Sequence, residues 1–339
     1  VEVEPGSIQT VDVAGTNIER GGMGLTWSPD SKWLAYSKTF PNMLRRIVVW
    51  SVDTGAATPV TDKMADASSP AWDRDARHLY FLASTNLALA SGWANTSSMQ
   101  ADPTYAAYVS VLRADDPSPF PPQSDEEEGE GEEGVEGEEG EKDEDPETES
   151  DSEVLIDFDG IERRIIALPM PVRNYRMMVA GPKGSVFIGE SVPRSFGMTV
   201  QKFTLEDREA EEFVSNASQV TVSADGEKML FRSGSRWRIV GTSSKPGNND
   251  GALTVALRMR LDRLEEWSQI FAEAWRYQRD FFYDPDMHGN DWDAVWRRYE
   301  PMIPFVRHRS DLNYLLDQVN GELSVGHSFV RGGDTPAVD

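Results

Sequence analysis

One twelve-residue pattern recurs four times in this chain and restricts its fold more than any other feature. Each copy is a short apolar strand, a polar turn containing Asp, Gly or Pro, and a second strand rich in aromatic and aliphatic residues. The strongest turn is Asp225-Gly226, because glycine tolerates the positive φ angle that tight hairpins require. The copies are Leu25–Tyr36, Pro70–Phe81, Met178–Gly189 and Val220–Phe231. The pattern predicts four β-hairpins of one design.

The spacing of the copies predicts a β-propeller. Trp27 and Trp72 are 45 residues apart, which is the period of a four-stranded propeller blade, and the last two copies are similarly spaced. Arg46–Trp50 and the turn at Asp53-Thr54-Gly55 supply the next strand of the first blade. A β-sandwich could contain similar hairpins, but one pattern at one period favours the propeller. We therefore expect a mainly β fold, a partial propeller of about four blades over residues 1–261, followed by a small helical region.

An acidic segment, residues 116–153, interrupts the blades. Between Ser124 and Glu153 it holds 18 Asp and Glu and one Lys, and so carries −17 of the formal net charge of −25. Such a segment repels itself and buries nothing, which predicts disorder from Pro117 through Glu153. We interpret it as a solubilising loop inserted into one blade, with a decoy for basic partners as the alternative. The rest of the chain carries −8, which indicates no large basic surface for nucleic acid.

The β pattern resumes after the acidic segment. Val154–Ile161 and Arg164–Leu168 are predicted to form two strands. Gly241–Gly251 has the composition of a long loop or linker. Thr254–Leu261 alternates between apolar and polar residues like one last strand, which could close the propeller ring.

From Leu264 the apolar period changes from two to 3.6, which predicts three helices over residues 262–339. The first helix ends at Asp284-Pro285, Asp291 caps the second, and Ser310 caps the third. The third helix is followed by His327, whose backbone the packed helices and a following strand could hold. The predicted buried faces are Trp267, Ile270, Phe271, Ala274, Trp275, Gln278 and Phe282; Trp292, Val295, Trp296 and Tyr299; and Leu312, Leu315, Leu316, Val319 and Leu323.

Few kinds of chemistry remain open to these residues. The chain has no cysteine, which excludes disulfides, thiolate metal sites and a cysteine nucleophile. It contains no His-Glu-x-x-His, Gly-x-Ser-x-Gly, phosphate-loop or dinucleotide-binding motif, and we predict neither a cofactor nor a bound metal. Its four histidines lack metal-ligand spacing. His78 is expected on a surface strand, His288 in a structural hydrogen bond, and His308 in an exposed position.

The C-terminal third of the chain resembles the tricorn protease family. The resemblance rests on Glu266-Trp267, Ala274-Trp275-Arg276, Gln278–Tyr283, Met287-His288-Gly289, Asp291-Trp292, Arg298–Pro301 and Gly321–Leu323 followed by His327. The hairpin pattern before it looks like the second propeller of the same family. The chain is thus similar to the last blades of that propeller and the first core subdomain, and the resemblance implies a PDZ domain and a second core subdomain in the same polypeptide.

The resemblance implies a serine endopeptidase with a divided active site. It places the catalytic histidine at His327, as the general base, and implies that the nucleophilic serine and a supporting glutamate lie in the second core subdomain. The imidazole would take the serine proton during attack on a peptide carbonyl and return it to the leaving amine. The archaeal form carries a serine of the catalytic set directly before its histidine, whereas this chain has Gly326 there. Whether Ser324 or Ser328 replaces that serine is left open.

The resemblance also implies peptide substrates that the propeller guides, a homo-oligomer and a cytoplasmic location. No apolar run approaches the length of a membrane span, and the N-terminus lacks a basic-then-apolar signal pattern. We therefore expect neither membrane nor nucleic-acid partners, and we expect this chain alone to be inactive. One alternative is a non-catalytic peptide-binding propeller in which His327 is only a packed residue. Another is an acidic scaffold that recruits basic proteins.

Overall fold

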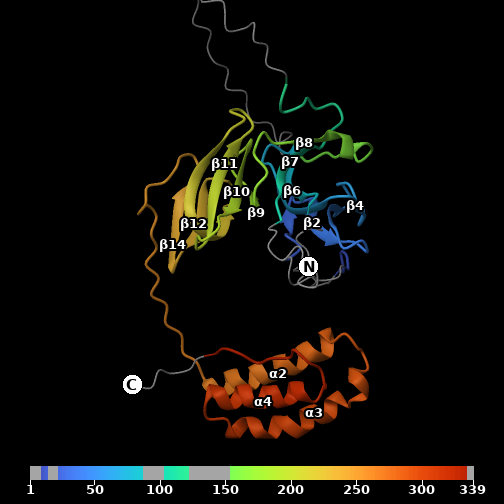
Figure 1. Cartoon of the computed structure of the whole chain (residues 1–339), viewed down its shortest axis with the longest axis vertical. Helices are drawn as coiled ribbons and strands as arrows, with labels where there is room; N and C mark the ends of the chain where they lie inside the picture. Colours follow the sequence, from blue (N-terminus) through green and yellow to red (C-terminus); the bar gives the residue numbers. More distant parts are fainter. Residues whose placement is uncertain (1–8, 14–21, 87–102, 122–152, 334–339) are drawn as a thin grey trace, which may run out of the picture. The chain divides into compact units, whose positions relative to one another are not determined.

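The computed structural model describes residues 9–13, 22–86, 103–121 and 153–333. The chain divides into two compact units between Thr254 and Val255. The first unit contains the strands and the second contains the helices (Figure 1). The boundary expected between propeller and core subdomain, at Leu261 and Asp262, stays a prediction.

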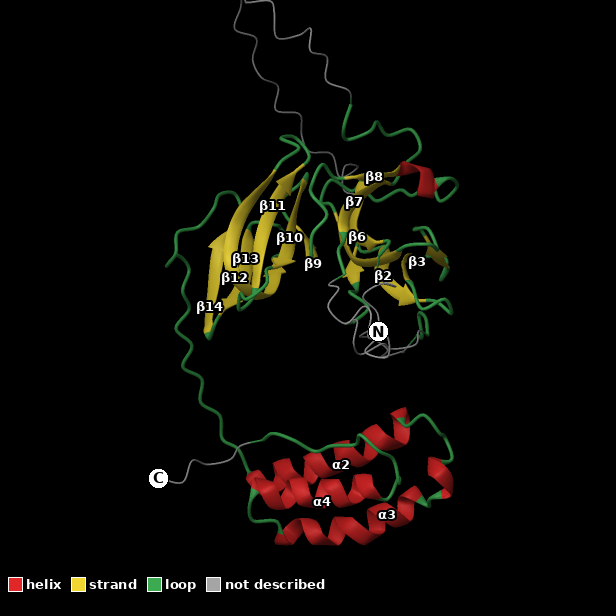
Figure 2. Ribbon diagram, viewed as in Figure 1, coloured by secondary structure: helices red, strands yellow, loops and turns green. Residues whose placement is uncertain are grey.

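Within the described residues, the first unit consists of antiparallel sheets in which consecutive strands are neighbours (Figure 2). The first sheet contains β1 (Thr26–Trp27), β2 (Trp33–Thr39), β3 (Arg45–Ser51) and β4 (Ala57–Pro59). The second contains β5 (Asp66–Trp72), β6 (His78–Ser84), β7 (Ala106–Val111) and β8 (Ile165–Ala167). The third contains β9 (Tyr175–Ala180), β10 (Ser185–Ser191), β11 (Met198–Thr204), β12 (Ala210–Val222), β13 (Lys228–Ser233) and β14 (Arg236–Gly241).

The four repeated sequence patterns form four equivalent hairpins. They are β1 with β2, β5 with β6, β9 with β10, and the end of β12 with β13. In each turn a backbone N–H donates to the carbonyl that opens the second strand, over 2.9 Å in all four cases. These bonds join Ser28 to Trp33, Asp73 to His78, Gly181 to Ser185, and Ser223 to Lys228. The prediction of four hairpins of one design is confirmed.

The six-stranded sheet holds two blades that share one strand. β12 pairs with β11 from Ala210 to Ala217 and with β13 from Ala217 to Val222. Asn216 and Gln219 have positive φ angles of 53° and 52°, and both pairings contain register shifts, which are the marks of bulges that bend a strand. After β14, Ala252 forms an antiparallel bridge with Arg238, in the place of a fourth strand. The sheets therefore provide four blades, and the predicted mainly β, partial propeller is confirmed.

The blades pack face to face because their inner strands are apolar on both faces. In β6, Leu79 and Phe81 belong to the core shared with the first blade, whereas Tyr80 and Leu82 belong to the core shared with the next blade. None of these four side chains is more than 2% exposed. β10 divides its residues between two cores in the same way. Strands buried on both faces have continuous apolar runs, which accounts for the aromatic and aliphatic second half of the repeated pattern.

Val154–Ile161 does not form the predicted strand, although Ile165–Ala167 confirms the strand that follows. The backbone N–H of Val154 donates to Asp30 Oδ2 over 2.9 Å, and its carbonyl accepts from the indole N–H of Trp33 over 2.9 Å. Ile161 is buried and begins a short 3₁₀ helix, η3 (Ile161–Arg164). The N–H of Asp157 donates to the carbonyl of Leu112 over 3.0 Å. These contacts bind the segment at single points and replace the pairing of a partner strand.

The two ends of the acidic segment are held by contacts, which corrects the expectation of disorder there. The ring of Phe120 packs edge-on against Phe203 with 6.4 Å between centroids, and Arg208 donates to the carbonyl of Pro121 over 2.9 Å. Glu153 pairs with Lys32 over 2.6 Å. A partly buried ring and an ion pair are local features that cannot be inferred from the charge composition of the segment. The remainder of the segment expected to be disordered, residues 122–152, lies outside the described residues.

The last predicted strand, Thr254–Leu261, is wrong, whereas Gly241–Gly251 is the loop that was expected. The chain from Leu253 to Leu261 has no strand assignment. The side chains of Leu257 and Met259 are 89% and 79% exposed. An alternating pattern becomes a strand only where a neighbouring strand supplies hydrogen bonds, and no strand of the described residues pairs with this segment.

The second unit is a group of three helices that lie side by side (Figure 2). Its elements are α2 (Arg263–Phe281), η4 (Met287–Gly289), α3 (Trp292–Tyr299), η5 (Glu300–Phe305) and α4 (Arg309–Gly321). All predicted inward residues of the third helix are 6% exposed or less. The other two predicted faces, except Gln278, also belong to this core. Within the described part of the chain, no helix combines the length and apolar character needed to cross a membrane.

The helix starts follow local capping rules, with one correction. Asp291 caps α3 as predicted, since its carboxylate accepts from the N–H of Ala294 over 2.8 Å. The cap of α4 is His308, not Ser310. The ring of His308 accepts from the N–H of Ser310 over 3.2 Å, and the carboxylate of Asp311 accepts from the N–H of His308 over 2.9 Å. This reciprocal pair closes the helix start earlier than a serine cap would.

Candidate functional site

The candidate catalytic histidine lies in an exposed turn that follows α4. His327 is exposed and has a left-handed backbone conformation with φ at 61°. Its ring meets that of Phe329 edge-on, with 6.2 Å between centroids, and Phe329 is itself 64% exposed. Within the described residues, neither ring nitrogen of His327 has a hydrogen-bond partner. The ring is therefore open to a group that is supplied from outside this unit.

The strand expected after His327 is not formed by the described residues up to Gly333, which corrects that expectation. The chain instead returns to the helices. Val330 packs partly against the helical core, and Asn313 Nδ2 donates to the carbonyl of Gly332 over 2.9 Å. Because no strand forms here, the alternation of side chains along a strand cannot decide which serine, Ser324 or Ser328, replaces the one that the archaeal form carries directly before its histidine.

His288 makes the structural hydrogen bond that was expected. Its Nδ1 lies 3.0 Å from the carbonyl oxygen of Leu323, and its Nε2 contacts the hydroxyl of Tyr283. A carbonyl oxygen only accepts, so Nδ1 carries the proton and Nε2 accepts from the tyrosine. Both nitrogens of His288 are thus used. His308 is exposed, as expected, and serves as the helix cap described above.

His78 is not the surface residue that was predicted. It begins β6 but is only 8% exposed, and its Nδ1 lies 2.5 Å from Asp75 Oδ2. Burial acts to raise the pKa of Asp75, but the hydrogen bond and charge of His78 outweigh it and lower that pKa. Burial raises the pKa of the neighbouring Asp73. The hairpin pattern alone does not reveal that this end of β6 is buried.

Asp73, Asp75 and His78 form the one group among the described residues with the donor types and spacing of a metal site. Their oxygens are already occupied. Asp73 accepts from the backbone N–H groups of Asp75 and Gly184 over 3.0 and 2.9 Å and from the hydroxyl of Tyr80 over 2.5 Å. Both oxygens of Asp75 also accept, one from backbone N–H groups and one from His78. A cation would have to displace these donors, so the group is interpreted as a structural link between blades.

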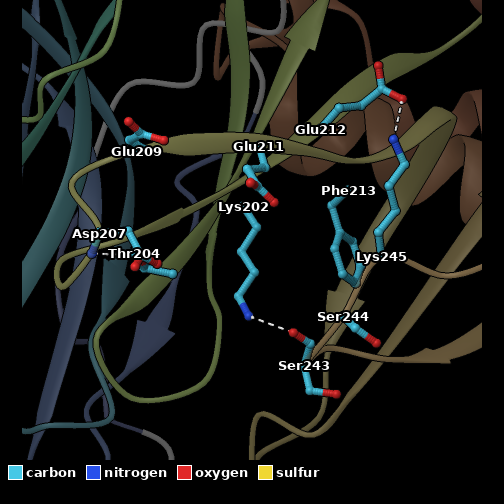
Figure 3. A pocket seen from close by; sticks show the side chains of 10 residues that line it. All are labelled: Lys202, Thr204, Asp207, Glu209, Glu211, Glu212, Phe213, Ser243, Ser244 and Lys245. Carbon is cyan, nitrogen blue, oxygen red and sulfur yellow. Dashed lines mark hydrogen bonds and ion pairs between the residues drawn. The ribbon is translucent and has the colours of Figure 1, made fainter.

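A separate cleft of about 360 Å³ lies beside β11 and β12 in the first unit (Figure 3). Lys202 Nζ donates to the carbonyls of Thr242 and Ser243, and Lys245 pairs with Glu212 over 3.1 Å. Both lysines are thus used by the protein itself. The cleft is lined by Lys202, Thr204, Asp207, Glu209, Glu211, Glu212, Phe213, Ser243, Ser244 and Lys245. Its four acidic side chains outnumber its two lysines, so the cleft favours a cationic group.

Comparison with known proteins assigns both units to one family. The model of the tricorn protease second beta propeller domain matches residues 6–243. The model of the tricorn protease C1 domain matches residues 263–321. The chain belongs to the tricorn protease family. This confirms the resemblance that the helical motifs and the hairpin pattern indicate.

Individual members of the family match nearly the whole chain. Tricorn protease homolog 1 of Streptomyces coelicolor is 28% identical over 98% of this chain and 32% of its own length. Tricorn protease of Thermoplasma volcanium is 24% identical over 100% of this chain and 32% of its own length. The crystal structure of the tricorn protease superposes with a TM-score of 0.70 at 17% identity, over 97% of this chain and 31% of that chain. The chain therefore spans about a third of the length of these relatives, and the structural match supports the fold.

The family models do not extend to the candidate catalytic histidine. The C1 match ends at Gly321, before His327. Sequence reasoning identified His327 and His288, but it missed Asn290 and Glu322, whose side chains hold the end of α4. Their signals are a glutamate directly after a helix-ending glycine and an asparagine in a Gly-Asn-Asp turn. Neither signal indicates which residue is the partner, because Asn290 and Glu322 come together only in the folded unit.

Proposed function

We propose that this chain is the histidine-bearing part of a tricorn-type serine endopeptidase, with His327 as the general base. The observation that carries the proposal is the open ring of His327, on a turn whose two ends are tied to the helical core. The membership of both units in the tricorn protease family supports it. The nucleophilic serine and a supporting glutamate are proposed to come from a second core subdomain, beyond a PDZ domain, of the same polypeptide.

In this proposal the histidine moves one proton in each direction. The neutral ring of His327 takes the proton of the serine hydroxyl as the oxygen attacks the peptide carbonyl, and then delivers it to the leaving amine. Backbone N–H groups stabilise the oxyanion that forms between these steps. Anchoring of the turn on both sides keeps the ring in place, which matters because correct orientation of the reacting groups supplies a large part of the rate enhancement.

The propeller is proposed to guide peptides to or from this site in a cytoplasmic homo-oligomer. In isolation the chain is expected to be inactive, because it holds the general base without its nucleophile. A mixture of the isolated chain with a separately produced remainder of the polypeptide should recover cleavage if the two parts reassociate. The isolated chain should show none with any peptide substrate.

The direct test replaces His327 with alanine in the full-length protein. The variant is expected to lose about 10³-fold or more in kcat/KM for a fluorogenic peptide, which is the typical effect of removing one member of a catalytic triad. Its melting temperature should not change, because the ring is exposed. The matched control is His308→Ser, which removes another exposed histidine but keeps a residue able to cap α4. Near wild-type cleavage by His327→Ala would overturn the proposal.

A non-catalytic, peptide-binding propeller is the second candidate, and the acidic cleft beside β11 and β12 favours it. In that case the isolated chain should bind a lysine-rich peptide, and Glu209→Gln with Glu211→Gln should weaken that binding. The full-length protein should then cleave no peptide, whatever the state of the two glutamates. Equal binding of lysine-rich and glutamate-rich peptides would remove this candidate, because the cleft would then not discriminate by charge.

A further inference from the structure

The backbone just ahead of His327 is tied down by side chains from another part of the helical unit. Asn290 Nδ2 donates to the carbonyl of Glu322 over 3.0 Å, and His288 Nδ1 donates to the carbonyl of Leu323 over 3.0 Å. Carbonyls at the C-terminal end of a helix have no partner within the helix, so they are natural acceptors for such side chains. The two donors therefore hold the two residues that directly follow α4, at the point where the chain leaves the helix.

The side chain of Glu322 is held as firmly as its backbone. Its Oε1 accepts from the hydroxyl of Tyr299 and from Arg298 Nη1, both over 2.6 Å and both from α3. The hydrogen bond from Tyr299, and then that from Arg298, lower the pKa of Glu322 against the opposing effect of burial. This residue is thus bound through its carbonyl by the turn before α3 and through its carboxylate by α3 itself.

The donor His288 is itself fixed in one orientation. Its backbone is left-handed, with φ at 56° and ψ at 32°, and its N–H donates to Asp284 Oδ2 over 3.1 Å. The ring of Phe282 meets the imidazole edge-on with 5.1 Å between centroids. Non-glycine residues adopt this backbone conformation rarely, and strained turns persist only where their surroundings hold them. The imidazole is therefore aimed at the carbonyl of Leu323 before any substrate arrives.

We propose that His288, Asn290 and Glu322 are positioning residues that set the place of the His327 ring, an inference that rests on the proposed function. We refer to these three residues as the clamp. Between the clamp and His327 the chain contains a second strained residue, Ser324, with φ at 53°. Ser324 and His327 are thus two left-handed residues in one short turn, and they keep this conformation only if the chain is held on both sides of the turn. The clamp holds the upstream flank, and Asn313 and Val330 hold the downstream flank.

The clamp acts on the rate of the chemical step and not on peptide binding. A displacement of about 1 Å in a reacting group can cost roughly 10²-fold in rate, whereas substrate contacts elsewhere are unaffected. Loss of a clamp residue should therefore lower kcat and leave KM close to its wild-type value. No clamp side chain contacts the ring of His327 in the described residues, so the clamp variants should keep the wild-type shape of the pH–rate profile.

The first experiment compares three substitutions of His288 in the full-length protein. Asparagine places its amide N–H where Nδ1 stood, whereas the longer glutamine places its polar group nearer the position of Nε2. His288→Ala and His288→Gln are expected to lower kcat by about 10- to 100-fold, and His288→Asn should recover most of that loss. If His288 had only a structural role, the loss of kcat would follow the loss of melting temperature. His288→Asn would then recover no more kcat than His288→Gln.

The second experiment replaces Asn290 with aspartate, which has the same shape but turns the shared donor into an acceptor. Asn290 Nδ2 contacts the carbonyls of both Met287 and Glu322, over 2.8 and 3.0 Å, so the variant places oxygen against oxygen twice. We expect kcat to fall by about 10²-fold with KM within about 3-fold of wild type. The matched control is Asn248→Asp, in an exposed loop of the other unit, which should behave as wild type.

The outcomes separate this inference from the proposed function. Measured beside the clamp variants, an active His327→Ala enzyme would overturn the proposed function and the clamp with it. An inactive His327→Ala enzyme together with wild-type kcat in His288→Gln and Asn290→Asp would overturn the clamp alone. If His288→Ala fails to fold, Asn290→Asp and the comparison of His288→Asn with His288→Gln decide the matter. Equal loss of kcat in those last two variants would also count against the clamp.

Discussion

The two units use their histidines in opposite ways. In the propeller, His78 is buried, bound to Asp75 and part of a network that reaches Gly184 in the next blade. In the helical unit, His327 is exposed and its ring nitrogens have no hydrogen-bond partner among the described residues. A carboxylate neighbour is a usual mark of a catalytic histidine. Here that mark belongs to His78, in the buried network of the propeller, and the open ring belongs to His327, the candidate general base.

The difference follows from the architecture of the two units. A propeller must join neighbouring blades, and buried charged groups do so in several places. Arg45 and Asp66 pair across the first two blades with 2.6 Å between Nη2 and Oδ2, and Asp66 is fully buried. The proposed active site is divided between two subdomains, so its proposed general base has to stay open within its own unit until its partner arrives.

The largest expected effect is at the buried ion pair. Asp66→Ala leaves the guanidinium of Arg45 buried without its carboxylate, because Asp66 accepts three hydrogen bonds from that guanidinium and one from the backbone N–H of Arg45. The free energy of unfolding of the propeller unit should fall by about 3–5 kcal/mol. Urea denaturation, with the exposed Asp53→Ala as control, measures it. A loss below about 1 kcal/mol would break the comparison, because it would mean that buried charge does not hold these blades.

The second effect separates the two histidines directly. His78→Ala removes the partner of a buried carboxylate and should cost about 1–3 kcal/mol of stability. In the full-length protein the same change should leave kcat/KM for peptide cleavage within a few-fold of wild type at a temperature where the variant is folded. Thermal melts and kinetic assays on one preparation of each variant test both statements. The comparison fails if His78→Ala loses activity as His327→Ala is expected to do.

The third prediction concerns the pH dependence of the clamp. Hydrogen bonds from Tyr299 and Arg298 lower the pKa of Glu322 below its ordinary value of 4.5. The carboxylate therefore contributes its full stability above pH 4.5, and this contribution is lost as the pH falls through the lowered pKa. The difference in melting temperature between wild type and Glu322→Gln should be present at neutral pH and should narrow below that value. Glu300→Gln, at an exposed glutamate, is the control; a difference that does not vary with pH would exclude the carboxylate as its source.

The smallest effect is expected at Gly326. No atom lies within 4 Å of the position that a Cβ would occupy there, and the residue does not have a positive φ. Gly326→Ser should therefore change the free energy of unfolding by no more than about 0.5 kcal/mol. The same variant also tests the site, because a gain in kcat would assign a role in catalysis to a serine directly before His327. A clear loss of stability would show that the turn is more tightly packed than its open surroundings indicate.

Periodicity alone was enough to predict the main elements of both units. The repeated pattern located the hairpins of four blades, and the 3.6-residue period located the buried faces of α2, α3 and α4. These features are local, because the spacing of apolar residues records which face of a strand or helix is buried. Even the cap at Asp291 needs only the residues that follow it.

The tertiary structure decided every feature that depends on a distant partner. Thr254–Leu261 has the alternation of a strand but no strand beside it, and Val154 is held by Asp30 and Trp33 from the first blade instead of a sheet. His78 is buried and bonded to Asp75, although its place at the start of a hairpin strand predicted a surface position. The sequence by itself determined the blades, the helices and the candidate histidine. Only the fold decided which histidine is open and which side chains hold its turn, because such contacts join residues whose order along the chain carries no record of their proximity.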